Sequence, residues 1–357
     1  MKKTLQIAWR TRGILARILW PFSRVYGLLT ASRRELYRRG FLASHRVAVP
    51  VIVVGNVTVG GGGKTPLVMA LLAHFTKRGM SPGVVSRGYG RRGTGCLEVM
   101  SDTPVHESGD EPAHIKRDQA APVFVANDRI QAARALLAAY PLTRVIISDD
   151  GLQHDRLQRT LNIVVFDDSG LGNGWMIPAG PLRQPWPLAS RTVPMLVLHT
   201  GSQSASAGLM CVAGFTSQRQ LADAATGING VPVLLASLSN VEITSAVPGA
   251  LIALAGIAHP EAFFGMLTAR GIPLARTVSL ADHADFSGFD LSSLRLPGEA
   301  RITVLCTEKD AVKLFELPQD PNVRVLAVPL LFAPENAFFA ALDQALGQSL
   351  ESAVDRP

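Results

Sequence analysis

The sequence is poor in cysteine and lacks any long uninterrupted apolar run. Its three cysteines are far apart, with no CxxC pair and no metal-ligand spacing, so we expect neither a structural zinc site nor a disulfide framework, and a reducing compartment is indicated. No stretch reaches the roughly 18 consecutive apolar residues of a membrane-spanning helix. A secretory signal is not expected either, because no small-residue cleavage site precedes residue 51.

Acidic residues are almost absent from the first 46 residues, which contain eleven Lys or Arg and a single acid, Glu35. This segment carries a net charge of +10 while the whole chain carries +7, so residues 47–357 are close to −3. The basic character is therefore confined to residues 1–46, which we call the arm. Because no base-reading or stacking motif accompanies it, we expect no nucleic-acid partner.

Apolar residues in this arm recur at about helical spacing with arginines between them, and Trp9 and Trp20 are suited to the headgroup boundary of a bilayer. Residues 1–46 are therefore predicted to form a basic amphipathic helix that lies on an anionic membrane surface. The alternative is a helix packed against the body of the protein, with its arginines in water.

From residue 47 the chain alternates strand and helix patterns, which predicts an α/β fold: a P-loop NTPase-type parallel sheet with helices on both faces, plus a second, smaller α/β lobe. A Pro/Gly-rich stretch, residues 170–187, interrupts the alternation. We expect an arm (1–46), a P-loop domain (47–187) and a second lobe that completes a cleft (188–357). The expected strands are 51–55, 83–86, 97–100, 122–126, 145–149, 163–167, 194–198, 231–236, 251–256, 302–306 and 323–328, and the expected helices are 65–79, 110–119, 128–140, 259–270, 310–316 and 334–346.

The stretch VIVVGNVTVGGGGKTPLVMAL, residues 51–71, joins an apolar β-branched strand to a helical pattern through a glycine run and Gly-Lys-Thr. This layout is typical of a phosphate-binding P-loop, in which backbone amides surround an anion at a helix N-terminus. Lys64 is predicted to reach the β- and γ-phosphates and Thr65 to bind Mg²⁺. The usual motif has glycine six residues before the lysine, where this chain has Thr58, so the loop is a variant, or else a glycine-rich turn that only permits close packing. The residues predicted to bind the nucleotide here are Thr58, Gly60, Gly61, Gly62, Gly63, Lys64 and Thr65.

Two further motifs contain adjacent acidic residues, one at the end of a predicted strand and one at the start of a predicted helix. Asp149 and Asp150 end the apolar strand RVIISDD, where an acid beside a P-loop holds Mg²⁺ directly or through water; a solvated turn is the alternative. Asp110 and Glu111 in SGDEP open a predicted helix, either as ordinary capping or with one carboxylate accepting a proton from an attacking hydroxyl. His283, in a polar loop of the second lobe, could reach across and orient Asp110, although a lone loop histidine is usually solvated.

Three motifs are weaker. Arg183 in GPLR could stabilise transition-state charge beside phosphates. Lys309 and Asp310 in TEKD could bind a nucleobase edge or could cap a helix. Tyr89, among the arginines of SRGYGR, could contact an anion or a sugar or could lie in a solvated basic loop.

The chain resembles the tetraacyldisaccharide 4′-kinases, the lipid A 4′-kinases, over nearly its whole length, in the motifs VPVIVVGNVTVGGGGKTP, SRGYGR, SGDEP, NDR, DDGLQH, GPLR, the DH pair at 282–283 and TEKD. The resemblance implies transfer of the γ-phosphate of ATP, with Mg²⁺, to the 4′-hydroxyl of a tetraacylated glucosamine disaccharide 1-phosphate, giving lipid IVA. It also implies peripheral attachment at the cytoplasmic face of the inner membrane. The acylated substrate and the anionic surface are then the partners, and no obligate protein partner is indicated.

The resemblance also implies roles for single residues. Asp110 resembles the base for the 4′-hydroxyl and His283 its partner, while Asp149 and Asp150 resemble the metal-side carboxylates. Two positions depart from the family pattern, because Ala284 replaces a common aromatic or histidine and Gln184 replaces a common acid. Further active-site groups implied by the resemblance are Glu111, Arg129, Gln153 and Arg183.

Two other classes of protein compete with a lipid kinase. One is a P-loop ATPase or GTPase that switches conformation to control a partner at the membrane surface. Switch proteins with deviant loops carry a second lysine five residues before the P-loop lysine, and Val59 occupies that position here. The other is a non-catalytic membrane-binding module, for which Lys64 would be dispensable.

Overall fold

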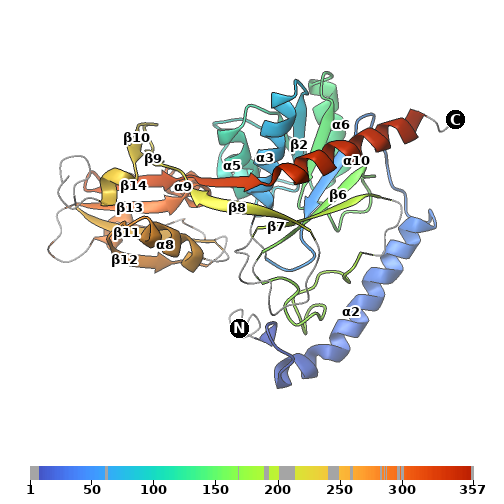
Figure 1. Ribbon diagram of the computed structural model, residues 1–357, viewed down its shortest axis with the longest axis horizontal. Helices are drawn as coiled ribbons and strands as arrows, with labels where there is room; N and C mark the ends of the chain where they lie inside the picture. The colour runs from blue at the N-terminus through green and yellow to red at the C-terminus, as the bar shows by residue number, and fades with distance from the viewer. Residues whose placement is uncertain are drawn as a thin grey trace.

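The computed structural model describes residues 8–60, 63–167, 169–188, 193–200, 214–239, 249–257, 260–281, 284, 286, 288–295, 298 and 301–354. Two β-sheets form two lobes that lie side by side, and a long helix near the N-terminus lies along the lobe that carries the larger sheet (Figure 1). The mixed α/β architecture with a large parallel sheet confirms the predicted fold class.

Within the described residues the larger sheet has nine strands, in the order β15-β8-β7-β6-β1-β5-β2-β4-β3. Pairing is parallel from β8 to β4, and only the outer strands β15 and β3 pair antiparallel. β1 is central, between β5 and β6, so the loop that follows it opens at the carboxyl edge of the sheet. The strands are β1 (Val51–Gly55), β2 (Pro82–Ser86), β3 (Leu97–Val99), β4 (Val123–Val125), β5 (Val145–Asp149), β6 (Leu161–Phe166), β7 (Met195–His199), β8 (Phe215–Leu221) and β15 (Leu330–Pro334).

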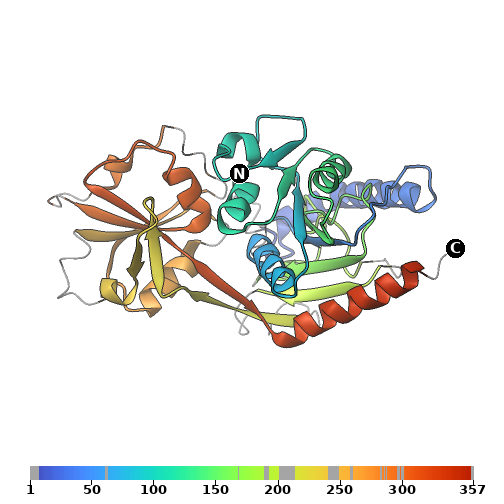
Figure 2. The same cartoon turned by 90° about the horizontal axis from the view of Figure 1, so that it is seen from above.

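The second sheet has six described strands, in the order β10-β9-β14-β13-β11-β12. Four of them are parallel, and β9 and β10 extend the sheet in antiparallel fashion. The sheet forms a separate lobe, and β8 and β15 run between it and the larger lobe (Figure 2). Its strands are β9 (Ala224–Gly227), β10 (Pro232–Leu234), β11 (Ala250–Ala255), β12 (Leu274–Ser279), β13 (Ile302–Thr307) and β14 (Val323–Val328).

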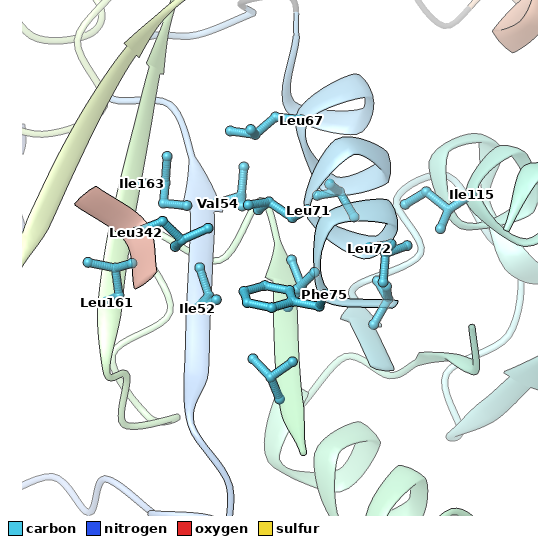
Figure 3. Close-up of a cluster of buried hydrophobic side chains, with 14 of the residues drawn as sticks. Ile52, Val54, Leu67, Leu71, Leu72, Phe75, Ile115, Leu161, Ile163 and Leu342 are labelled. Carbon is cyan, nitrogen blue, oxygen red and sulfur yellow. The ribbon is translucent and has the colours of Figure 1, made fainter. Parts of the chain in front are cut away.

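Helices cover both faces of the larger sheet, as strands buried on both sides require. Along β1, Ile52 and Val54 contribute to one apolar cluster with α3, α5 and α10, while Val51 and Val53 contribute to another with α6 on the opposite face. Figure 3 shows the first cluster, with Ile52 beside Phe75 and Val54 beside Leu71 of α3. The helices are α2 (Ile14–Arg38), α3 (Lys64–Lys77), α4 (Val105–Ser108), α5 (Asp110–Asp118), α6 (Arg129–Ala139), α7 (Ala236–Ser239), α8 (Pro260–Ala269), the 3₁₀ helix η2 (Leu291–Leu294), α9 (Glu308–Leu314) and α10 (Asn336–Val354).

Every expected helix and strand overlaps an observed one, but the predicted boundary at residues 187/188 does not coincide with the division between the sheets. β7, β8 and β15 belong to the larger sheet although they follow residue 187, and α10 packs on that sheet. The sequence analysis assigned none of β8, β9, β12 and β15. Polar residues dominate β8 (FTSQRQL), so its pattern lacks the apolar signal that marks central strands.

The N-terminal helix α2 packs against the Pro/Gly-rich segment that the sequence analysis placed between the two halves of the chain. The Ser23 hydroxyl accepts a hydrogen bond from the Ala179 amide at 3.1 Å, and the Tyr26 hydroxyl donates to the Arg183 carbonyl at 3.0 Å. Among the described residues, none of the helices combines the length and the apolar character of a membrane span.

Candidate active site

The pairing of β1 with β5 creates the site. The two strands are parallel, and the register sets Val54 beside Asp149, so the loop after β1 meets Asp149, which ends β5, and Asp150, which follows it, at the same edge of the sheet. α3 begins directly at Lys64, and Gly63 before it has a φ of 104°, a left-handed conformation that favours glycine. The predicted Gly-Lys-Thr junction between strand and helix is therefore present.

The departure from the usual glycine spacing has a structural reason. Thr58 is buried and forms an isolated antiparallel bridge with Leu182, so it is extended and needs no glycine. Val59 N–H donates to the Pro181 carbonyl at 2.8 Å, and Arg183 N–H donates to the Val57 carbonyl at 2.7 Å. The GPLR motif thus braces the first half of the loop, and this bracing was not predicted from the sequence.

Asp150 lies at the centre of a cluster of cations. Its side chain pairs with Arg183 Nη1 at 3.2 Å and with Lys64 Nζ at 3.9 Å, and its carbonyl accepts a hydrogen bond from Arg129 Nη2 at 3.0 Å. Burial by itself would raise the pKa of Asp150, but the cations Lys64, Arg183 and Arg129 outweigh burial and lower it. Asp150 also has a φ of 44°, and no other non-glycine residue in the described part of the chain has a positive φ.

Asp149 has the opposite environment. Its carboxylate is fully buried, and neither oxygen has a hydrogen-bond partner among the described residues. Burial, and then the negative charges of Glu111 and Asp150, raise the pKa of Asp149 well above its usual range. A buried carboxylate without donors is costly unless a cation compensates it.

These residues fit a magnesium ion. The described residues contain no group of three or more His, Cys, Asp or Glu side chains that could enclose a metal, but Mg²⁺ commonly takes one or two carboxylates and completes its shell with water and phosphate oxygens. Asp149 and Asp150 would supply the carboxylates, and Thr65 would supply a hydroxyl from the first turn of α3. Gln153 joins the same edge of the sheet by donating to the Asn56 carbonyl at 3.0 Å.

Asp110 is the first residue of α5 and is held by close backbone packing. Gly88 and Gly109 both have positive φ, and a Cβ on Gly109 would lie 2.9 Å from the Tyr89 carbonyl oxygen. The backbones of the SRGYGR and SGDEP motifs therefore pack directly against each other. The Asp110 carboxylate forms an ion pair with Lys313 Nζ at 2.7 Å, a contact between the lobes that the sequence analysis did not predict.

Gly109→Ala is expected to destabilise the protein and to lower its activity, because φ 91° and ψ 157° form a conformation that essentially only glycine adopts. We expect a loss of about 1–3 kcal/mol in the free energy of unfolding, measured by urea denaturation. Gly265→Ala in α8 is the control, since a Cβ there meets nothing within 4 Å. Equal stability of the two variants would show that the contact between the two motifs is not required.

The remaining predicted residues lie as follows. Asp310 is buried, and its carboxylate accepts hydrogen bonds from the Gly256 amide at 3.0 Å and the Thr307 hydroxyl at 2.7 Å. The helix cap in TEKD is Thr307, whose hydroxyl accepts a hydrogen bond from the Asp310 N–H at 3.3 Å, and binding of a nucleobase edge stays a prediction. Lys309 is half-buried in the first turn of α9, and the Tyr89 side chain is 68% exposed. The predicted roles of Gly61, Gly62 and His283 fall on residues outside the described ranges.

The chain matches proteins of one kind in three comparisons. Residues 15–347 match the family model described as LpxK, tetraacyldisaccharide-1-P 4′-kinase. The chain is 57% identical to a tetraacyldisaccharide 4′-kinase from Polaromonas naphthalenivorans strain CJ2, over 96% of this chain and 94% of that one. It is 42% identical to one from Delftia acidovorans, over 96% and 94% of the two chains. Its fold matches a crystal structure of the "apo" form of LpxK from Aquifex aeolicus in complex with ATP, with a TM-score of 0.73 and 28% identity over 94% of this chain and 99% of that one.

Proposed function

Since the chain belongs to the tetraacyldisaccharide-1-P 4′-kinase family, it is an ATP-dependent kinase of a lipid A precursor, and we propose that Asp110 accepts the proton of the attacking 4′-hydroxyl. The observation that carries the proposal is the meeting of three elements at one edge of the larger sheet. Lys64 begins α3 after the loop that follows β1, Asp149 ends β5 with Asp150 next to it, and the negative charge of Glu111, at the start of α5, contributes to the raised pKa of Asp149. A switch protein is not favoured by these comparisons.

Phosphoryl transfer needs charge balance and alignment more than covalent chemistry from the protein. The 4′-oxygen forms a bond to the γ-phosphorus, the bond from that phosphorus to the β–γ bridging oxygen breaks, and ADP leaves. The hydroxyl proton passes to Asp110. Lys64 and Arg183, both within 4 Å of Asp150, supply positive charge beside the developing phosphate charge.

Thr65 and Asp149, with Asp150, would hold Mg²⁺ at this edge. When bound, the ion neutralises negative charge on the β- and γ-phosphate oxygens. The chain's own contribution is the buried carboxylate of Asp149, whose oxygens have no hydrogen-bond partner among the described residues. The cations Lys64 and Arg129 offset part of the cost of its burial, and a bound metal cation would offset more.

The test of the proposed chemistry is label transfer. The full-length protein is incubated with magnesium, γ-labelled ATP and a tetraacylated glucosamine disaccharide 1-phosphate in mixed micelles. We expect the label on the lipid, at the 4′-position of the distal sugar. Label found only as free phosphate would support an ATPase and contradict the kinase.

The membrane attachment expected from the sequence is part of the proposal. One side of α2 contacts the larger lobe, while apolar side chains at helical spacing on the other side are exposed; they include Ile14, Ile18, Phe22, Val25 and Leu29, each more than half exposed. Arginines lie between them. A helix of this kind places its apolar side in the headgroup boundary and its cations near anionic lipid, and ATP in the cytoplasm fixes the cytoplasmic leaflet as the place of reaction.

Phe22→Ser combined with Leu29→Ser is expected to weaken binding to anionic vesicles at least about tenfold, because two exposed apolar side chains, 63% and 65% exposed, are removed from the proposed bilayer contact. Co-sedimentation with vesicles at low and high salt measures it. Leu142→Ser removes an equally exposed leucine from the loop before β5 and should bind normally. Unchanged sedimentation of the double variant would remove α2 as the anchor.

A further inference from the structure

We propose that Lys313, on α9 of the second lobe, is a positioning residue that holds the Asp110 carboxylate for proton transfer. The inference rests on the proposed role of Asp110. It assigns the second lobe a direct part in arranging the base, through a contact between helices of the two lobes.

The ion pair between these residues is short and mostly enclosed. Lys313 Nζ lies 2.7 Å from Asp110 Oδ2, and the two side chains are only 15% and 13% exposed. Pairs of this kind are screened by salt much less than surface pairs. The ammonium donates a charge-assisted hydrogen bond to the carboxylate, and such bonds are shorter and stronger than those between neutral groups.

The ammonium of Lys313 is itself held in place. It donates a hydrogen bond to the Ala284 carbonyl at 2.9 Å and lies 5.7 Å from the centre of the Phe286 ring. These contacts restrict a side chain that otherwise has many rotamers. Since its position is fixed, its bond to Oδ2 fixes the rotation of the Asp110 carboxylate as well.

The contact between α5 and α9 does not depend on Lys313 alone. Arg117 donates to the Val312 carbonyl at 3.1 Å and pairs with Glu316 at 3.2 Å, and Val105, Ala113 and Val312 form a small apolar cluster. Removing the Lys313 ammonium is therefore expected to leave the helices in contact. Arg117→Gln weakens the same contact without touching Asp110, which makes it the matched control.

The experiment compares steady-state kinetics of Lys313→Met, Lys313→Arg and Arg117→Gln, with thermal unfolding of each variant as a check of folding. We expect Lys313→Met to lower kcat at least about tenfold with the KM for ATP changed less than about threefold, Lys313→Arg to recover most of the loss, and Arg117→Gln to stay within about twofold. In an Asp110→Asn background, Lys313→Met should cause no further loss, because it acts through that carboxylate.

Two results would overturn the role of Lys313 but leave Asp110 as the proposed base. The first is low turnover of Asp110→Asn together with normal turnover of Lys313→Met. The second is a full additional loss of turnover when both substitutions are combined. Equal losses in Lys313→Met and Arg117→Gln would also overturn it and assign the effect to helix contact. Near-normal turnover of Asp110→Asn would instead overturn the proposed base, and the inference with it.

Discussion

Asp110→Asn is expected to lower turnover about 10²–10⁴-fold while ATP affinity stays nearly unchanged. The amide matches the carboxylate in size but cannot accept the hydroxyl proton. Its oxygen can still accept a hydrogen bond from Lys313, which lies 2.7 Å from Oδ2 in the present structure, so the start of α5 should keep its position. Turnover is measured by label transfer, and ATP affinity by titration with a fluorescent analogue.

The control for this prediction lies on the same helix. Asp118 ends α5 and is exposed, and its carboxylate accepts a hydrogen bond from the side chain of its neighbour Gln119. Asp118→Asn should therefore retain turnover. If Asp110→Asn lost ATP affinity by the same factor as turnover, Asp110 would belong with the metal-side carboxylates and another group would have to be the base.

Lys64→Met is expected to reduce kcat/KM about 10²–10³-fold and to weaken ATP binding, because the variant removes the cation that begins α3 beside the phosphate site. The fold should persist, since Asp150 keeps its pair with Arg183 at 3.2 Å when Lys64 is gone. Lys77→Met, at the exposed end of the same helix, is the control. Unchanged kcat/KM and ATP affinity of Lys64→Met would contradict the prediction and show that this lysine is dispensable for phosphate binding.

The sequence analysis predicted the fold and the phosphate loop because both depend on local patterns. Buried β-branched runs mark β1, β5 and β6, and glycine followed by Lys64 and Thr65 marks the junction with α3. Asp149 and Asp150 were identified from their place at the end of an apolar run, and parallel register brings them to the loop.

Other parts of the site depend on contacts between distant residues and leave no local signal. The bridge between Thr58 and Leu182 joins segments more than 120 residues apart, and Lys313 contacts Asp110 from α9 of the second lobe. The motif TEKD predicts either nucleobase binding or a helix cap, and Thr307 forms such a cap by accepting a hydrogen bond from the Asp310 N–H. Lys309 and Lys313 are one helical turn apart, so both lie on the same side of α9. This spacing is the feature of the sequence from which a basic side of the helix could have been predicted.

The path of the chain through the larger sheet determines how the protein can be divided. All strands of the second sheet fall between β8 and β15, and those two strands are themselves paired, with Leu221 opposite Leu330. The smaller lobe is thus an insertion into the continuous larger sheet that carries the P-loop, not a C-terminal appendage. Cutting the chain after residue 187 removes three strands of the larger sheet, β7, β8 and β15, together with α10 and its core side chains Phe338 and Leu342. A tight turn joining Leu221 to Leu330 would instead excise the smaller lobe and spare them.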